Sequence, residues 1–185
     1  GRHYMSHRNT VMMALSPFKR NPTVFQKTLA VNDFYERGWG NIQMRGKIHK
    51  EMLKNNSSFL IRSAASFIAP RSIDLWLMTE DFPDPENKVV ITKTGQIKLI
   101  VNENNIMAHK HLVKKAGSIM KKAGYKIILQ DKRGISAVQH QCGTVRIGDS
   151  AESSPLDKWC RSFDFPNLFV VDGSFFPSSG AVNPA

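Results

Sequence analysis

Short stretches of alternating or continuous apolar residues predict several β-strands. Residues 41–47 alternate between apolar and polar side chains, as expected of a strand with one buried face. The apolar runs at residues 73–79 (IDLWLMT) and 168–171 (LFVV) have the length and composition of buried strands. Residues 1–28 hold one short apolar run, at 11–15, and two prolines, so we expect them to be mostly loop.

A β-hairpin is predicted in the middle of the chain. Residues 88–93 and 96–101 are both rich in β-branched side chains, and they flank the pair Thr94-Gly95. Two such runs about a glycine-containing turn are typical of a hairpin.

An amphipathic helix is predicted over residues 105–124. Most lysines in this stretch fall away from its apolar face, and Gly124 is a typical helix end. Residues 47–69 also tolerate a helix, after an Asn/Ser-rich loop. The apolar face of the 105–124 helix is formed at helical spacing by Leu112, Val113, Ala116, Ile119 and Met120.

The composition is that of an ordinary globular chain. Its 185 residues are 41% hydrophobic and 22% charged, which argues against disorder. The most apolar stretch, residues 58–70, is interrupted by Arg62, so no run of 18 apolar residues exists. We therefore expect no transmembrane helix.

The charge balance raises the question of nucleic-acid binding. There are 26 Lys and Arg residues against 15 Asp and Glu, a formal net charge of +11. Phosphate neutralisation by such residues drives nucleic-acid binding. However, the main lysine cluster reads as the solvated face of the 105–124 helix, without the interleaved aromatic residues of a single-strand binder. We therefore expect no nucleic-acid partner. Nucleic-acid binding is kept as a competing hypothesis, which would predict a steep loss of affinity with rising salt.

The cysteines and most histidines give no support for a metal site. Cys142 and Cys160 lie 18 residues apart without a CxxC pair, which favours neither a zinc site nor a disulfide framework. His109 and His111, at positions i and i+2 of the predicted helix, point to different faces. His3 and His7 lie in the opening loop. We expect no bound metal.

Two segments near the C-terminal end carry candidate chemistry. His140 opens HQCGTVRIG, where glycines permit close backbone approach, and such a histidine can act as a base near neutral pH. In residues 170–184 (VVDGSFFPSSGAVNP) a short apolar run feeds a glycine turn, a common way to present backbone N–H groups to an anion. Taken singly, the two segments are better explained by a structural histidine and a plain surface turn.

Together these segments resemble the C-terminal part of the glucose–methanol–choline (GMC) flavoprotein oxidoreductases, in particular their bacterial sugar- and alcohol-dehydrogenase-like members. The similarity extends over nearly the whole chain and is most specific in residues 136–185. The segments that carry it are GRHYMSH, TEDFPDPENKVVITKTGQIKL, ENNIMAHKHLVKKAGSIMKKAG, HQCGTVRIG, SSPLDKWCR and NLFVVDGSFFPSSGAVNPA.

The resemblance implies an FAD-dependent enzyme that oxidises an alcohol or a sugar hydroxyl by hydride transfer to flavin N5. His140 would be the catalytic base, and Asn183 the second catalytic residue that holds the substrate oxygen. Asp172 and Gly173 would lie against the flavin pyrophosphate, and Asn183 with Pro184 beside the flavin ring. FAD is the expected cofactor, and a small alcohol or sugar the expected substrate.

The fold class we expect is α+β. Residues 20–135 would form a substrate-binding domain, an antiparallel sheet with helices on one face. Residues 1–19 and 136–185 would belong to an α/β flavin-binding domain. The only GxG in the chain, Gly38-Trp39-Gly40, lacks the context of a dinucleotide-binding motif. We therefore expect the C-terminal portion of a longer enzyme, inactive without the N-terminal half of that domain.

Three matters stay open at this level. The chain could be a non-catalytic basic module that retains the family's substrate-domain fold. The motifs do not identify the substrate. They also do not identify the electron acceptor, which could be oxygen, a quinone or a haem protein. The cellular location is equally open.

Overall fold

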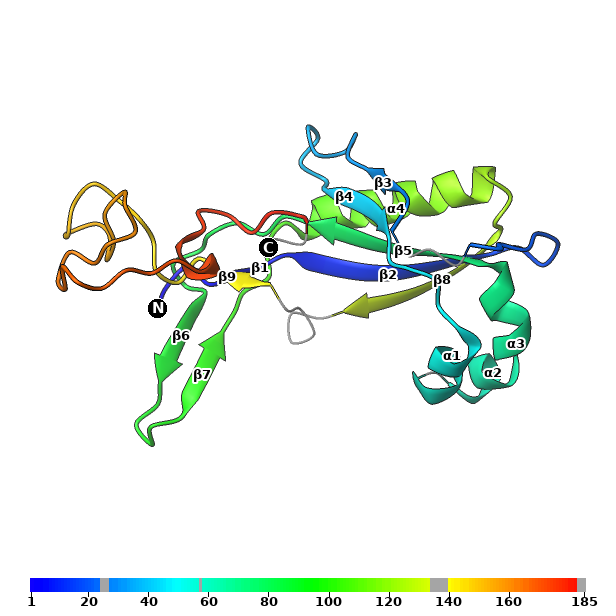
Figure 1. Cartoon of the computed structure of the whole chain (residues 1–185), viewed down its shortest axis with the longest axis horizontal. Coiled ribbons are helices and arrows are strands. Elements are labelled where there is room, and N and C mark those ends of the chain that lie inside the picture. The colour runs from blue at the N-terminus through cyan, green and yellow to red at the C-terminus, as the bar shows by residue number, and fades with distance from the viewer. Residues whose placement is uncertain (24–26, 57, 134–139, 183–185) are drawn as a thin grey trace. The chain divides into compact units, whose positions relative to one another are not determined.

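The structure, a computed structural model, describes residues 1–23, 27–56, 58–133 and 140–182 (Figure 1). The chain forms two compact units, each assembled from segments that are distant in sequence. One unit comprises residues 1–8, 79–106 and 134–185, and the other comprises residues 9–78 and 107–133. The predicted boundaries between a flavin-binding and a substrate-binding domain remain a prediction.

A five-stranded sheet, in the order β3-β4-β5-β2-β8, organises the unit of residues 9–78 and 107–133 (Figure 1). The pairs β3–β4, β4–β5 and β2–β8 are antiparallel. β4 and β5 confirm the strands predicted from residues 41–47 and 73–79. The strands span Arg8–Leu15 (β2), Ala30–Val31 (β3), Asn41–Met44 (β4), Ser72–Thr79 (β5) and Ile127–Arg133 (β8).

The interpretation of residues 1–28 as mostly loop is wrong, because β2 is an inner strand of this sheet. Seven of its eight residues are buried. A strand covered on both faces has no polar face, so its sequence is a continuous apolar run instead of an alternating one. The apolar run at residues 11–15 is the part of this strand that the sequence pattern shows.

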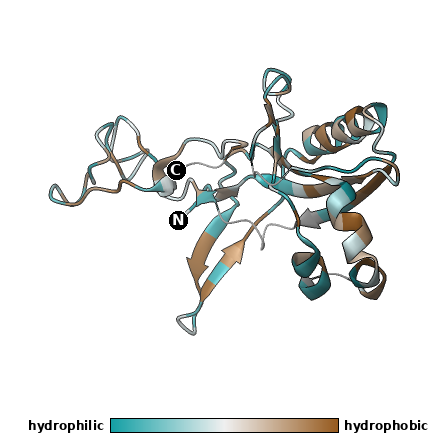
Figure 2. Cartoon of the chain, turned by 45° about the vertical axis from the view of Figure 1, so that its right-hand side comes forward, coloured by the Kyte–Doolittle hydropathy of each residue, from teal (hydrophilic) through white to brown (hydrophobic). Residues whose placement is uncertain are grey.

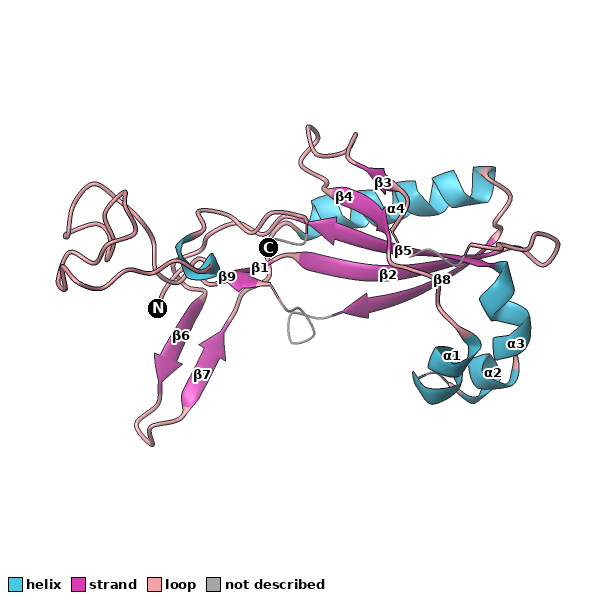
Figure 3. Cartoon of the chain, in the orientation of Figure 1, coloured by secondary structure: helices cyan, strands magenta, loops and turns pink. Residues whose placement is uncertain are grey.

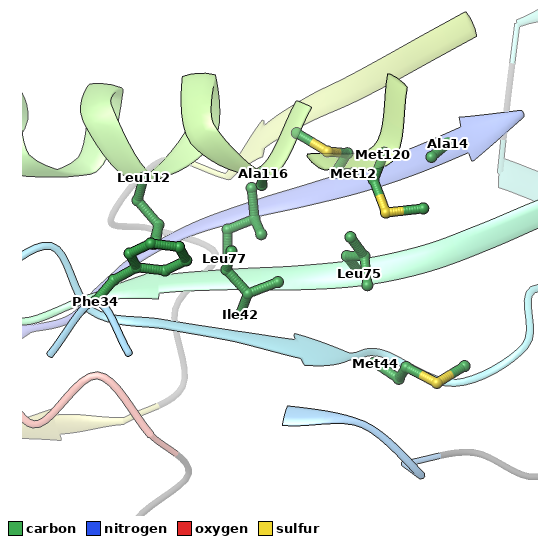
Figure 4. Close-up of a cluster of buried hydrophobic side chains, with 10 residues drawn as sticks. All are labelled: Met12, Ala14, Phe34, Ile42, Met44, Leu75, Leu77, Leu112, Ala116 and Met120. Carbon is green, nitrogen blue, oxygen red and sulfur yellow. The ribbon is translucent and has the colours of Figure 1, made fainter. Parts of the chain in front are cut away.

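One face of the sheet is covered by helix α4 (Ile106–Lys122), which confirms the predicted amphipathic helix (Figure 3). Gly124 adopts a φ of +93° just after the helix, and its N–H donates to the carbonyl of Lys121. The core between α4 and the sheet, shown in Figure 4, contains Met12, Ala14, Phe34, Ile42, Met44, Leu75, Leu77, Leu112, Ala116 and Met120.

The opposite face of the same sheet is covered as well, so the expectation of helices on one face only is wrong (Figure 3). Met12 and Met13 are both buried, and successive strand residues point to opposite faces, so both faces of β2 are apolar and need cover. The covering elements are α1 (Lys50–Asn56), α2 (Phe59–Ser63), α3 (Ala65–Ile68) and the 3₁₀ turn η1 (Ala69–Arg71). Their cluster contains Met13, Leu15, Ile48, Leu53, Ala65, Ile68 and Ala69.

The other unit contains the predicted hairpin and a pair of very short strands. β6 (Lys88–Ile91) and β7 (Ile97–Ile100) pair antiparallel, as the sequence predicted. Figure 2 shows hydrophobic residues on both strands, although Ile91 and Ile97 are exposed. β1 (Met5–Ser6) pairs antiparallel with β9 (Gln141–Cys142), and a 3₁₀ turn, η3, spans Gly173–Phe175.

The strand predicted at residues 168–171 is wrong, because this segment forms only an isolated bridge between Phe169 and Arg161. The backbone of this segment hydrogen-bonds to a loop, where the N–H of Val170 donates to the carbonyl of Cys160. The side chain of Val171 is 80% exposed. An apolar run becomes a strand only where neighbouring strands take up its backbone groups, which is a property of the tertiary structure.

The observed architecture is thus a mixed α+β structure, which confirms the expected fold class at this level. None of the helices within the described residues has the length and hydropathy needed to cross a bilayer.

Candidate functional site

His140 lies at the end of a two-residue strand pair. In the antiparallel pairing of β1 with β9, Met5 faces Cys142 and Ser6 faces Gln141. One step further along the same register, His7 faces His140. The pairing therefore brings together two histidines that lie 133 positions apart in the chain.

A hydrogen bond joins these two imidazoles. Nε2 of His7 lies 2.7 Å from Nδ1 of His140, and the tautomers determine which nitrogen donates. The ring centroids are 4.9 Å apart, and the ring planes are tilted by 36°. His7 is only 1% exposed, whereas His140 is partly exposed. The half-buried His140 can reach a ligand while its Nδ1 is engaged.

The buried carboxylate of Asp81 fastens the segment before His7. Its Oδ2 accepts a hydrogen bond from the backbone N–H of Ser6 at 3.0 Å. The backbones of Asp81 and Ser179 exchange two hydrogen bonds of 3.2 Å. Burial raises the pKa of the Asp81 carboxyl, and the Ser6 N–H and the Arg8 guanidinium oppose that rise. Asp81 thus ties Ser6 to the segment that leads toward Asn183.

The glycine turn after β9 packs against the predicted phosphate-binding turn. The N–H of Gly143 donates to the carbonyl of Gly173 at 3.2 Å, and the N–H of Val145 donates to the carbonyl of Ser174 at 2.8 Å. Gly143 has a φ of +88°, and a Cβ there would overlap Cε of Met5. Only glycine fits this close approach without displacement of its neighbours.

Asp172 shapes the turn that follows. Its Oδ1 accepts hydrogen bonds from the backbone N–H of Ser174 at 2.8 Å and from the Ser174 hydroxyl at 2.5 Å. These bonds lower the pKa of the Asp172 carboxyl, which is solvent-exposed. The carboxylate therefore caps its own turn, next to the partly exposed Gly173.

The structure brings three of the predicted site residues into one unit. His140 precedes β9, and the backbone beyond β9 bonds directly to the turn of Asp172 and Gly173. Asn183 and Pro184 lie outside the described residues. The expected absence of a metal site stays a prediction, and in the described ranges no group of three or more His, Cys, Asp or Glu side chains could hold an ion.

The histidines of α4 lie in two different environments. Nε2 of His109 is 2.8 Å from Oγ1 of Thr10, and the ring of His111 is 5.4 Å from that of Trp39. Both cysteines are free thiols. That neither pair forms a shared ligand site stays a prediction.

Sequence reasoning missed His7, which it placed in an unremarkable loop. No spacing rule connects His7 with His140, because their proximity depends on the pairing of β1 with β9. The one available signal was that GRHYMSH belongs to the segments with family resemblance.

Comparison with known proteins identifies the family. Residues 83–185, more than half of the chain, match the family model described as GMC oxidoreductase. The matched range contains His140, Asp172, Gly173, Asn183 and Pro184.

Several characterised proteins are similar over parts of the chain. A 2-methyl-1,2-propanediol dehydrogenase from Mycolicibacterium austroafricanum is 53% identical over 45 residues, 24% of this chain and 8% of that protein. A paromamine 6'-oxidase from Streptomyces fradiae is 39% identical over 67 residues, 36% of this chain and 12% of that protein. The fructose dehydrogenase large subunit of Gluconobacter japonicus is 25% identical over 119 residues, 60% of this chain and 22% of that protein.

The aligned regions thus span less than a quarter of the length of each of these relatives. Their names describe two dehydrogenases and one oxidase. Since the family match covers more than half of the chain, this chain belongs to the GMC oxidoreductase family and carries its C-terminal domain.

Proposed function

We propose that this chain is the C-terminal part of an FAD-dependent oxidoreductase that oxidises a small alcohol or a sugar hydroxyl, with His140 as the base. The observation that carries the proposal is the placement of His140 within the family-matched range, half-buried and hydrogen-bonded through Nδ1. The relatives named above support the substrate class, since they are alcohol and sugar dehydrogenases or oxidases.

The imidazole of His140 would accept the proton of the substrate hydroxyl. With Nδ1 engaged by His7, Nε2 of His140 is the nitrogen that remains for the substrate hydroxyl. As Nε2 takes the hydroxyl proton, the carbon becomes a better hydride donor, and loss of the hydride completes the carbonyl. The carboxamide of Asn183 would donate a hydrogen bond to the substrate oxygen and orient it without adding a titrating charge.

The GMC oxidoreductases are FAD-dependent, and the residues present fit such a cofactor. Asp172 is exposed with its carboxylate turned onto Ser174, and Gly173 is partly exposed, so the backbone N–H groups of this turn are the groups that would face an anionic group. Phe169 and Val171 beside it are exposed apolar residues that further protein or cofactor could cover. In the complete enzyme, Asp172, Gly173, Asn183 and Pro184 would hold FAD, which supplies the hydride acceptor.

The domain assignment is part of the same proposal. Residues 1–19 and 136–185 would complete a flavin-binding domain whose N-terminal half is supplied by further sequence, and residues 20–135 would shape the substrate pocket. We expect the 185-residue chain alone to be inactive. The acceptor could be oxygen, a quinone or a haem protein.

The test is the substitution His140→Ala in the complete enzyme. We expect turnover to fall about 100-fold or more, as for loss of a general base, while the flavin absorbance of the purified protein is retained. His49→Ala, which removes an exposed histidine, is the matched control. Unchanged turnover in His140→Ala would refute the assignment of the base, and a purified complete enzyme without flavin absorbance would refute the cofactor.

A further inference from the structure

We infer that His7 is a positioning residue that sets the tautomer of His140, by accepting a hydrogen bond from the Nδ1–H of His140. The inference rests on the proposed function, in which Nε2 of His140 is the base. It adds a residue from the opposite end of the chain to the catalytic machinery.

The short distance between the two ring nitrogens means that they share one proton in a hydrogen bond. The two nitrogens are 2.7 Å apart, a distance at which one carries the proton and the other offers a lone pair. Two arrangements exist for neutral rings. If Nε2 of His7 donates, Nδ1 of His140 is the acceptor and its proton lies on Nε2, which then cannot act as a base.

The other arrangement makes His140 competent. If Nδ1 of His140 carries the proton and donates to Nε2 of His7, the lone pair of His140 lies on Nε2, free for the substrate hydroxyl. Once Nε2 has taken that proton, the Nδ1–H of the imidazolium still donates to a neutral acceptor. A charge-assisted hydrogen bond of this kind stabilises the cation formed in the transition state.

The surroundings hold His7 in place for this role. The residue before it, Ser6, is fixed by pairing with Gln141 in β1–β9 and by its N–H bond to Asp81. His7 is only 1% exposed, so its ring is shielded from bulk solvent. A buried, backbone-anchored acceptor orients the ring of its partner, as outer partners of functional histidines generally do.

The kinetic test compares His7→Gln with His7→Leu in the complete enzyme. Gln places a carboxamide oxygen near the position of Nε2 and can still accept from Nδ1, whereas Leu retains bulk but no acceptor. We expect His7→Leu to lower kcat about 10- to 100-fold with KM nearly unchanged, and His7→Gln to recover most of that loss. Equal kcat in both variants, whether both match the wild type or both are equally impaired, would overturn the inference.

A second measurement does not depend on turnover. Nitrogen-15 NMR of the imidazoles in the wild-type complete enzyme should show the proton of neutral His140 on Nδ1, with a through-bond coupling to an unprotonated Nε2 of His7. A proton on Nε2 of neutral His140 would overturn the inference even if a His7 variant failed to fold.

The two proposals fail in different ways. If His140→Ala leaves turnover unchanged, the proposed function is wrong, and the NMR experiment still reports on the hydrogen bond. If His140→Ala abolishes turnover but His7→Leu has wild-type kcat, the base assignment stands and the positioning role of His7 is wrong.

Discussion

The backbone N–H of Ser6 donates a 3.0 Å hydrogen bond to the carboxylate of Asp81, 75 residues further along the chain. The backbones of Asp81 and Ser179 also exchange two hydrogen bonds, so Asp81 connects its own segment to two others. These two lead directly to the proposed site residues, since His7 follows Ser6 and Asn183 lies four positions after Ser179. The stability of the site should therefore depend on this carboxyl.

Asp81→Asn should become more stable relative to the wild type as the pH rises. Burial raises the pKa of Asp81 above its ordinary value of 3.8, so ionisation costs more in the folded than in the unfolded chain. At a pH below 3.8 this cost does not apply to the wild type, and at a pH above the raised pKa of folded Asp81 it applies in full. The cost is about 1.4 kcal/mol for each pH unit by which the folded pKa exceeds the unfolded one. The asparagine never ionises, but its carbonyl still accepts from Ser6.

The measurement is the free energy of unfolding of both proteins by urea denaturation from about pH 3.5 upward, with exposed Asp33→Asn as the control. A difference between Asp81→Asn and the wild type that shrinks with rising pH would contradict the prediction.

Gly143→Ala should disrupt the contact between β1 and the turn after β9. The new Cβ would overlap Cε of Met5 and the carbonyl oxygen of His3, and the carbonyl is backbone that cannot rotate away. Gly95→Ala is the matched control, because its φ is also positive, at +80°, but a Cβ added there would have no atom within 4 Å.

We expect Gly95→Ala to cost about 1–2 kcal/mol through backbone strain alone, and Gly143→Ala to cost distinctly more. Thermal unfolding of the two variants measures the difference. Equal losses would mean that the chain relaxes around Met5 and His3.

Leu77→Ala should strongly destabilise the five-stranded sheet. Leu77 is fully buried in the cluster between the sheet and α4, so truncation leaves a cavity that the neighbouring strands cannot close (Figure 4). The expected loss is about 2–5 kcal/mol in the free energy of unfolding. Leu60→Ala removes the same atoms from a residue that is 78% exposed and should change stability by about 0.5 kcal/mol or less. Similar losses at both positions would argue against this packing.

Lys47 and Asp74 should show energetic coupling. Nζ of Lys47 donates to the carbonyl of Ser72 at 2.8 Å and lies 3.9 Å from Oδ2 of Asp74, which also accepts from the N–H of Ile48. Burial lowers the pKa of Lys47 and raises that of Asp74, so each charge depends on the other for compensation.

A double-mutant cycle with Lys47→Met and Asp74→Asn tests this coupling. Lys47→Met leaves a buried carboxylate without its cation, and Asp74→Asn removes that charge while it keeps an acceptor for Ile48. The loss from Lys47→Met should therefore be smaller in the Asp74→Asn background, by about 1–3 kcal/mol. Losses that simply add would show that the two groups act independently.

The sequence by itself determined the elements whose signal is local. The alternating residues of β4, the apolar run of β5, the hairpin about Gly95 and the amphipathic face of α4 are all present where predicted. In each of these, neighbouring residues alone define the pattern, through side-chain periodicity or turn conformation. The motifs with His140 and Asp172 likewise identified the family without any coordinates.

The tertiary structure decided what depends on partners distant in sequence. The run at residues 11–15 became an inner strand because sheet neighbours and covering helices lie on both sides, whereas the similar run at 168–171 did not pair into a strand. The contact between His7 and His140 exists because β1 pairs with β9 in one register. Local sequence carries no record of such pairings, since the free energy that selects them comes from surfaces contributed by other segments.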